Sequence, residues 1–334
     1  ADQAQFNPKR YVVGLAKAAA ETGCLIHENT RVSAIESDEK ETVVFVGHRK
    51  IKAGAVVKAT HTPIGEKAIM TLLGPYREYV VAAKLKSALP RGMYWAKRGD
   101  HHYAMRTATD ADGEEFLLCL GEPHKVGQDS NNQERFRKID AYMRERFEVG
   151  DAAWTWGAQH CKSADIIPYI GSYPSGNFYV ATGYSTDGLV YGTVAGLLLT
   201  DLIRGVENQW ASVYDPNRIN PLKSAGRFLK ENINVLGEFV KGRVSVREEA
   251  FRGVGAGEGK VLQIEGKKFA VYRDPDDALH VVSAVCPHMG CIVRWNQGER
   301  SWDCPCHGSR FTTTGEYLEG PSLHDLTKFT PSDT

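Results

Sequence analysis

The sequence predicts two domains: a mixed α+β and α/β domain over residues 1–240 and an all-β domain over residues 241–334. Three observations support this fold class. Residues 79–120 contain one β-type run after another, which is typical of an antiparallel sheet. The apolar run 177–181 leads through glycines into the helical pattern of 188–204, which is typical of an α/β unit. In the second domain, short β-type runs are separated by Gly, Pro and Asp, and no long helix is predicted.

The first elements can be assigned in chain order. Residues 8–22 are predicted to form a helix, because Pro8 suits its first turn, Gly23 follows its end, and Tyr11 and Leu15 keep helical spacing. Short strands are expected at 24–27, 32–35, 41–47 and 55–59.

The central sheet and its helix follow. Strands are expected at 79–85, 93–97, 102–108 and 115–120, with Gly or Asp in the turns between them. Residues 130–147 should form an amphipathic helix that buries Phe136, Ile139, Met143 and Phe147. The second domain should contain strands at 260–264, 268–272 and 279–285 and a short one at Leu318.

Composition excludes several function classes. The 334 residues include 41 basic and 41 acidic side chains, and residues 241–334 hold 12 and 13 of them. Neither domain therefore has the positive field that nucleic-acid binding needs. The longest uncharged run, residues 166–186, contains two prolines and cannot be a single membrane helix. The chain starts at Ala1 with no basic-then-apolar leader, and a bacterial cytoplasmic location is expected.

The cysteines fall into two groups. Cys24, Cys119 and Cys161 are scattered and are expected to be buried small hydrophobes. The other four lie in the runs CPHMGC (286–291) and CPCH (304–307). Each run supplies one Cys and one His in ligand spacing, whereas structural Cys2His2 zinc sites usually pair Cys with Cys. The pattern therefore favours a Rieske [2Fe–2S] centre, with a zinc site as the alternative.

The stretch CPHMGC…WDCPCHGSRF…GEYLEGP resembles the Rieske family in the form that carries an extra disulfide, as in cytochrome bc-type Rieske proteins. The resemblance implies a [2Fe–2S] cluster with Cys286 and Cys304 on one iron and His288 and His307 on the other. It also implies a disulfide between Cys291 and Cys306.

The run departs from the high-potential members of that family at one position. These members usually carry Tyr two residues after the serine, whereas here Ser309 is followed by Arg310 and Phe311. Hydrogen bonds to the cluster sulfurs and cysteine ligands stabilise the reduced state. We therefore expect a potential below that of the respiratory type, within the family range of about −150 to +300 mV.

The rest of the chain resembles FAD-dependent oxidoreductases of the D-amino-acid oxidase superfamily, in the bacterial group fused to a C-terminal Rieske domain. The matching runs include FNPKRYVVGLAKAAAETGCLIHENTRVSAI, VVKATHTP, GEPHKVGQ, TWGAQHCKSADIIPYIG and VATGYSTDGLVYGTVAGLLLTDLI. The resemblance implies an incomplete FAD-binding (Rossmann-like) domain with an antiparallel substrate sheet.

The sequence has no Gly-x-Gly-x-x-Gly turn, which normally holds the FAD pyrophosphate. The glycine-dense run 253–259 fails that spacing and is expected to be a loop. We expect that roughly the first third of the parent protein is absent, on the scale of one nucleotide-binding lobe, and that FAD is weakly held or lost in this form.

Candidate flavin and substrate residues follow from the resemblance. The glycines at 183 and 188 would let backbone N–H groups approach the flavin, although they could equally serve only a tight strand-to-helix turn. Arg106, on a predicted strand, could pair with a substrate carboxylate, or it could be a solvated surface residue. His124, His160 and Trp156 are pocket candidates, whereas His101 and His102 are expected in a turn. The flavin-binding candidates are Val32, Thr60, His61, Thr182, Gly183 and Gly188.

The expected function is an FAD-dependent oxidoreductase that passes electrons from a small substrate, such as an amine or amino acid, to the cluster and on to an acceptor protein. His288 and His307 are expected near the surface, facing that acceptor. The alternative is a Rieske electron-transfer module on a non-catalytic flavoprotein-like scaffold. A Rieske oxygenase is excluded, because the sequence has no Asp/Glu-x-x-His-x4-His spacing for its iron site.

Overall fold

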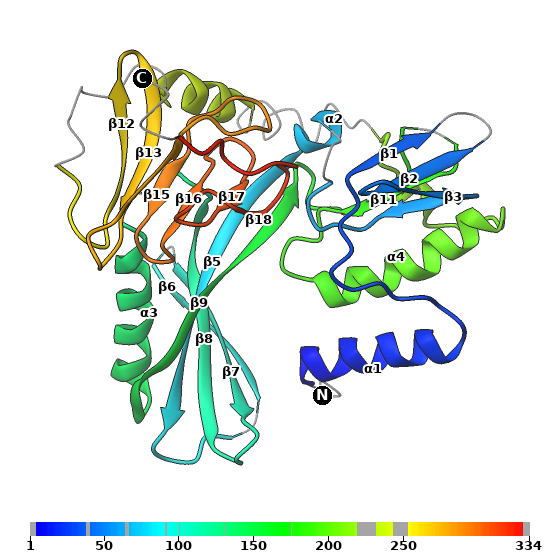
Figure 1. Ribbon diagram of the computed structural model, residues 1–334. Helices are drawn as coiled ribbons and strands as arrows, with labels where there is room; N and C mark the ends of the chain where they lie inside the picture. Colours follow the sequence, from blue (N-terminus) through cyan, green and yellow to red (C-terminus); the bar gives the residue numbers. More distant parts are fainter. Residues whose placement is uncertain are drawn as a thin grey trace. The chain divides into compact units, whose positions relative to one another are not determined.

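The computed structural model describes residues 5–37, 41–63, 67–90, 92–99, 101–129, 131–174, 176–218, 232–242 and 253–329 (Figure 1). By compactness the chain forms two units. The first comprises Ala1–Lys58, Tyr169–Ala181 and Asp187–Arg218, and the second comprises Ala59–Pro168, Thr182–Thr186 and Ile219–Thr334. This division differs from the sequence domains 1–240 and 241–334, which stay a prediction.

In its described residues, the first unit contains two small sheets and three helices. Its helices are α1 (Pro8–Glu21), α4 (Gly188–Ile203) and α5 (Ala211–Tyr214). One antiparallel sheet consists of β1 (Ala34–Ser37), β2 (Thr42–Val46) and β3 (Arg49–Ala53). The other has the order β10 (Tyr169–Ser172), β11 (Phe178–Thr182) and β4 (Val56–Lys58), with β11 parallel to β4.

The predicted helix at 8–22 is confirmed as α1. The Asn7 side chain caps it by accepting a hydrogen bond from the Arg10 amide at 3.1 Å, and Pro8 occupies the first turn. The strand expected at 24–27 is wrong: the segment is exposed and irregular, and Leu25 is 82% exposed. The prediction also missed β3, whose residues are mostly charged.

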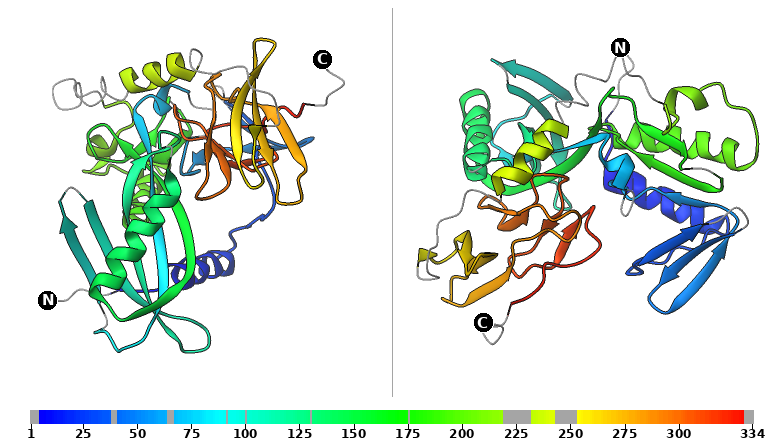
Figure 2. Two further views of the ribbon diagram at one scale, coloured as in Figure 1. Left: turned by 90° about the vertical axis from the view of Figure 1, so that its left-hand side faces the viewer. Right: turned by 90° about the horizontal axis from the view of Figure 1, so that it is seen from above.

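The second unit is built on a five-stranded antiparallel sheet with the order β6-β7-β8-β5-β9. Its cyan and green strands can be followed in Figure 2. Its strands are β5 (Leu73–Leu85), β6 (Met93–Arg98), β7 (His101–Thr109), β8 (Glu115–Lys125) and β9 (Val149–Ser163). The predicted strands between residues 79 and 120 are confirmed, but His101 and His102 lie in β7 rather than in a turn. The 15-residue strand β9 was not predicted.

Helix α3 (Asn132–Arg146) covers one face of this sheet, as its amphipathic pattern predicts. Ile139 and Met143 are fully buried against Tyr79, Val81 and other sheet residues. A short helix, α2 (Lys67–Met70), precedes β5, and residues 232–242 are also helical. None of the helices in the described ranges has the length and apolar character needed to cross a membrane.

The described residues 253–329 form an all-β region, as predicted. Two antiparallel sheets have the orders β12-β13-β14 and β15-β16-β17-β18. Their core includes Trp302, Phe311 and Leu326, none of them more than 1% exposed. The strands are β12 (Gly259–Ile264), β13 (Lys267–Arg273), β14 (Leu279–Ser283), β15 (Arg294–Asn296), β16 (Ser301–Asp303), β17 (Arg310–Phe311) and β18 (Tyr317–Glu319).

Candidate functional site

Two loops carry the clustered cysteines and histidines. The first loop, residues 286–291, joins β14 to β15, and its Cys286 amide donates to the Cys291 carbonyl at 2.8 Å. The second loop, residues 304–309, joins β16 to β17, and its Cys304 amide donates to the Ser309 carbonyl at 2.8 Å. Each loop is therefore closed by backbone hydrogen bonds, which fix the ligand-type side chains at their starts.

A disulfide between Cys291 and Cys306 joins the two loops, the pairing that the resemblance implies. The sulfur of Cys304 lies within 4.8 Å of both of these sulfurs. Because two of the three sulfurs are used in the disulfide, this trio is not a metal-ligand set. The cysteines that remain for a metal in these loops are Cys286 and Cys304.

The two remaining thiols are buried and face each other. Cys286 and Cys304 are each 1% exposed. A hydrogen bond with Cys304, together with the backbone amides of His288 and Met289 and the Ser309 hydroxyl, lowers the pKa of the Cys286 thiol to about 7 although burial opposes this. Donors that favour the thiolate suit a metal ligand, because the thiolate is the form that binds metal.

The two imidazoles stand beside each other. The ring centroids of His288 and His307 are 4.9 Å apart, and the rings are nearly perpendicular. His307 is 5% exposed, and its buried Nδ1 has no hydrogen-bond partner among the described residues. Burial, and then the nearby charge of His288, lowers the pKa of His307 to about 4, so that its ring is neutral as ligation requires. Both histidines were expected near the surface: His288 is partly exposed, whereas His307 is buried.

These donors fit a [2Fe–2S] group with two thiolates and two imidazoles. Two buried thiols and the buried Nδ1 of His307, which has no hydrogen-bond partner among the described residues, belong to the two loops that the disulfide joins. Beside them, Phe311 is fully buried and offers no hydroxyl to the site. The assignment of Cys286, His288, Cys304 and His307 to individual irons stays a proposal.

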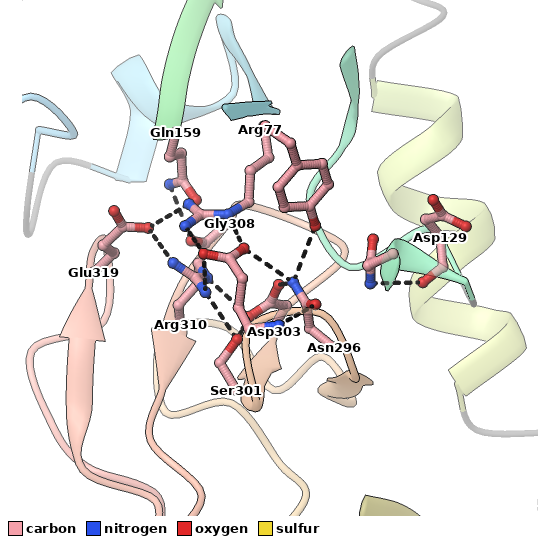
Figure 3. A network of polar contacts seen from close by, with 12 residues as sticks. Arg77, Asp129, Gln159, Asn296, Ser301, Asp303, Gly308, Arg310 and Glu319 are labelled. Carbon is pink, nitrogen blue, oxygen red and sulfur yellow. Dashed lines mark hydrogen bonds and ion pairs between the residues drawn. The ribbon is translucent and has the colours of Figure 1, made fainter. Parts of the chain in front are cut away.

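The second loop packs against the five-stranded sheet (Figure 3). The Gln159 amide of β9 donates to the Gly308 carbonyl at 3.1 Å. After β8, Gln128 donates to the Pro305 carbonyl at 3.0 Å, and Arg294 donates to the Gly127 carbonyl at 3.3 Å. Hydrogen bonds from two segments of the sheet thus reach Pro305 and Gly308, which directly follow the candidate ligands Cys304 and His307 in the loop.

A buried charge network joins the same two parts (Figure 3). Arg77 of β5 is 2% exposed and pairs with Glu299 through two nitrogens and with Glu319 at 3.1 Å. Arg310 pairs with Asp303 at 2.9 Å and with Glu319 at 3.1 Å. Burial opposes the charge of Arg310, but its three carboxylate neighbours raise its pKa above the usual value. Sequence reasoning missed this network.

The opposite face of the sheet carries aromatic side chains and one arginine. Cross-strand pairing places Trp154 and Trp156 of β9 on the same face as Ala82 and Val80 of β5. Arg106 lies opposite Leu118, and Leu118 pairs with Ala82, so Arg106 shares that face. The buried Nε of Arg106 has no hydrogen-bond partner among the described residues. We call this the open face.

Comparisons with known proteins agree with this geometry. Residues 1–202 match the family model of FAD dependent oxidoreductases. The chain belongs to this flavoprotein family. Residues 247–330 match the Rieske [2Fe-2S] domain, so the flavoprotein carries a C-terminal Rieske domain, and these two domains imply FAD and a [2Fe–2S] cluster as cofactors.

One relative matches nearly the whole chain, and another matches about a fifth of it. The Bacillus subtilis protein YhfW, named as a Rieske 2Fe-2S iron-sulfur protein, is 32% identical over 97% of this chain and 64% of its own length. The chain thus spans about 64% of that relative. The cytochrome b6-f complex iron-sulfur subunit of Chlorobaculum thiosulfatiphilum is 42% identical over 22% of this chain and 40% of its own.

Among solved structures, NikD, an amino acid oxidase of nikkomycin biosynthesis, matches with a TM-score of 0.50 and 15% identity over 63% of this chain and 60% of its own. At this identity the likeness shows the fold alone. Glycine oxidase from Geobacillus kaustophilus matches with a TM-score of 0.49 and 22% identity over 62% of this chain and 57% of its own.

The flavin candidates are distributed over both compact units of the flavoprotein. In the first unit, Val32 is exposed, and Gly188 opens α4, whose N-terminus has no side-chain cap. In the second unit, the Thr182 hydroxyl donates to the His61 carbonyl at 2.6 Å, and Gly183 has a φ of +78°. Thr60 donates to the Thr62 carbonyl at 2.6 Å. These hydrogen bonds order the loop around Thr60 and join it to the end of β11. The flavin-binding roles of these residues stay a prediction.

The substrate candidates do not all come together. Arg106 and His160 lie on the open face, where the His160 ring stacks on Tyr76 at 5.9 Å. Burial, and then Lys162, lowers the pKa of His160 to about 3. His124 lies on the other face, stacked on Tyr79 beside α3. Arg106 and His124 therefore cannot line one pocket.

The three scattered cysteines differ in exposure, and one cavity lies within the first unit. Cys119 and Cys161 are buried as predicted, but Cys24 is exposed. A cavity of about 330 Å³ in the first unit is lined by Ile170, Tyr179, Leu202 and Asp215 among others, and no predicted site residue lines it.

Proposed function

We propose that this flavoprotein oxidises a small amine or amino acid at FAD and passes the electrons to its Rieske cluster and then to an acceptor protein. One observation carries the proposal: a single compact unit holds both the two ligand loops and the sheet whose open face carries Arg106 and two tryptophans. A substrate face and an electron-carrying centre thus belong to the same folded body.

The substrate would bind on the open face. Its carboxylate would pair with the Arg106 guanidinium, whose buried Nε has no hydrogen-bond partner among the described residues. Trp154 and Trp156 lie on the same face, three strands away on β9, and would limit the access of water to that face. FAD, when bound, supplies the two-electron oxidation of the C–N bond and can release electrons singly.

The ligand loops would hold the one-electron centre. Cys286 and Cys304 would bind one iron as thiolates, and His288 and His307 would bind the other as neutral imidazoles. The partly exposed His288 would lie nearest to an electron-acceptor protein. We also propose a bacterial cytoplasmic location, because Cys119, Cys161 and Cys24 carry no disulfide.

The test uses the protein loaded with FAD and cluster under anaerobic conditions. A panel of amines and amino acids is added, and cluster reduction is followed by EPR. Cluster reduction that requires both substrate and flavin supports the proposal. If dithionite reduces the cluster but no substrate does, the Rieske module sits on a non-catalytic scaffold. An Arg106→Leu variant should lose the response to carboxylated substrates, whereas the matched control Arg98→Leu on β6 should keep it.

A further inference from the structure

The two ligand loops differ in exposure. In the second loop and the strands that flank it, every residue from 301 to 310 is buried. In and beside the first loop, Val285 and Met289 are 43% and 44% exposed, and His288 is partly exposed. One side of the candidate cluster site is therefore covered by protein, and the other side is open to partners.

The covering surface belongs to the five-stranded sheet, and glycines bring it into direct contact with the loop. A Cβ at Gly127 would lie 2.7 Å from the Pro305 nitrogen. A Cβ at Gly308 would lie 2.7 Å from the Pro75 Cβ, and one at Gly157 would lie 2.8 Å from the Glu299 carboxylate. Contacts this short leave no room for any side chain at these positions, so the two surfaces pack backbone against backbone or against a buried side chain.

Arg77 is the charged centre of this contact. It reaches from β5 to Glu299, in the turn between β15 and β16, and to Glu319 at the end of β18. Glu319 also pairs with Arg310, which directly follows the second ligand loop. Arg77 thus contacts residues on both sides of β16 and β17, the two strands that carry the loop. Two of its nitrogens pair with Glu299, before β16, and the third pairs with Glu319, in β18.

We infer that Arg77 is a positioning residue that holds the Rieske domain on the flavoprotein sheet and closes the His307 side of the cluster site. The domain then stays docked, and redox partners reach the cluster from the His288 side. This inference deepens the proposed function, because it defines how the electron centre is held beside the substrate-bearing sheet.

The test compares cluster-loaded Arg77→Met and Arg77→Lys with the control Arg98→Met, whose arginine lies on β6 at 57% exposure and pairs with Glu145. Hydrogen–deuterium exchange is measured for amides 304–310 and, as an internal reference, for β13 and β14. The second readout is the microwave-power saturation of the dithionite-reduced EPR signal with and without a soluble nickel complex as relaxing agent.

Arg77→Met should raise the exchange of amides 304–310 at least tenfold and increase relaxation by nickel, while β13 and β14 exchange as in the wild type. Arg77→Lys keeps the charge but loses the planar two-nitrogen pairing, so its amide exchange and its relaxation by nickel should lie between those of Arg77→Met and the wild type. Equal behaviour of Arg77→Met and Arg98→Met would overturn the inference.

If Arg77→Met fails to fold, Gln159→Leu replaces it, because this change removes only the hydrogen bond to the Gly308 carbonyl. The expected result is at least threefold faster exchange of amides 307–309, and wild-type exchange would overturn the inference. Because reduction is chemical, the outcome does not depend on flavin or substrate. A failure of the proposed function would appear separately, as a cluster that no substrate reduces.

Discussion

Replacement of Gly127 by alanine should disturb the contact between the sheet and the second ligand loop. Gly127 has a φ of +66°, and an added Cβ would lie 2.7 Å from the Pro305 nitrogen and 2.8 Å from the Asp303 carbonyl oxygen. Both neighbours are backbone atoms next to Cys304, so neither can move away as a flexible side chain would. The methyl group must therefore displace either the turn after β8 or the loop itself.

The magnitude has two parts. An alanine at positive φ costs about 1–2 kcal/mol, and forced overpacking costs about 1–3 kcal/mol. Gly113, in the turn between β7 and β8, separates these parts, because it has a φ of +85° and nothing within 4 Å of an added Cβ. Gly113→Ala should therefore lose only the conformational part, and Gly127→Ala should be about 1–3 kcal/mol less stable than this control.

Urea unfolding of both variants, followed by tryptophan fluorescence, measures this difference. The reduced-cluster EPR spectrum of each variant shows whether the loop has moved: it should change for Gly127→Ala and stay as in the wild type for Gly113→Ala. Equal stability losses together with two unchanged spectra would refute the packing of the loop against the sheet at this position.

Three further predictions concern the cluster, the sheet and the substrate. Phe311→Tyr should raise the cluster potential by about 40–90 mV, the equivalent of a hydrogen bond worth about 1–2 kcal/mol, and a redox titration without an upward shift would contradict the reasoning. Burial, and then the charge of Arg135, lowers the pKa of His124 to about 4. In the unfolded chain the pKa of this histidine is about 6.5, so below that pH the unfolded chain binds more protons than the folded protein. The free energy of unfolding is therefore highest above pH 6.5 and decreases as the pH falls toward 4. Between pH 7 and 5 the wild type should therefore lose about 2 kcal/mol more than His124→Asn in urea titrations, and parallel losses would contradict this. Arg106→Met should raise KM for carboxylated substrates about 10–100-fold and leave amines without a carboxylate unaffected, and equal effects on both would exclude the carboxylate role.

Local patterns predicted much of the fold. Alternating apolar residues indicated the strands between Tyr79 and Leu120, and Pro8 and Gly23 marked the ends of α1. Strand β9 was missed because its sequence, VGDAAWTWGAQHCKS, has Gly, Ala and Asp where strands usually carry β-branched residues. It is held by its long pairing with β5, and that register is a non-local property.

The ligand-type residues were visible in the sequence because Cys and His recur at short spacing in two runs. Their surroundings were not visible. Arg77 and Glu299 are 222 residues apart, and Gln159 and Gly308 are 149 apart, so no local signal links them. The burial of His307 follows from these distant contacts, so the motif alone could not predict it.

We propose that Cys286, His288, Cys304 and His307 hold a [2Fe–2S] cluster. The most direct measurement is the quantification of metal and acid-labile sulfide in the purified protein, combined with EPR before and after dithionite reduction. We expect two irons and two sulfides per chain and an EPR signal that arises only on reduction. One zinc per chain with no signal in either state would contradict it.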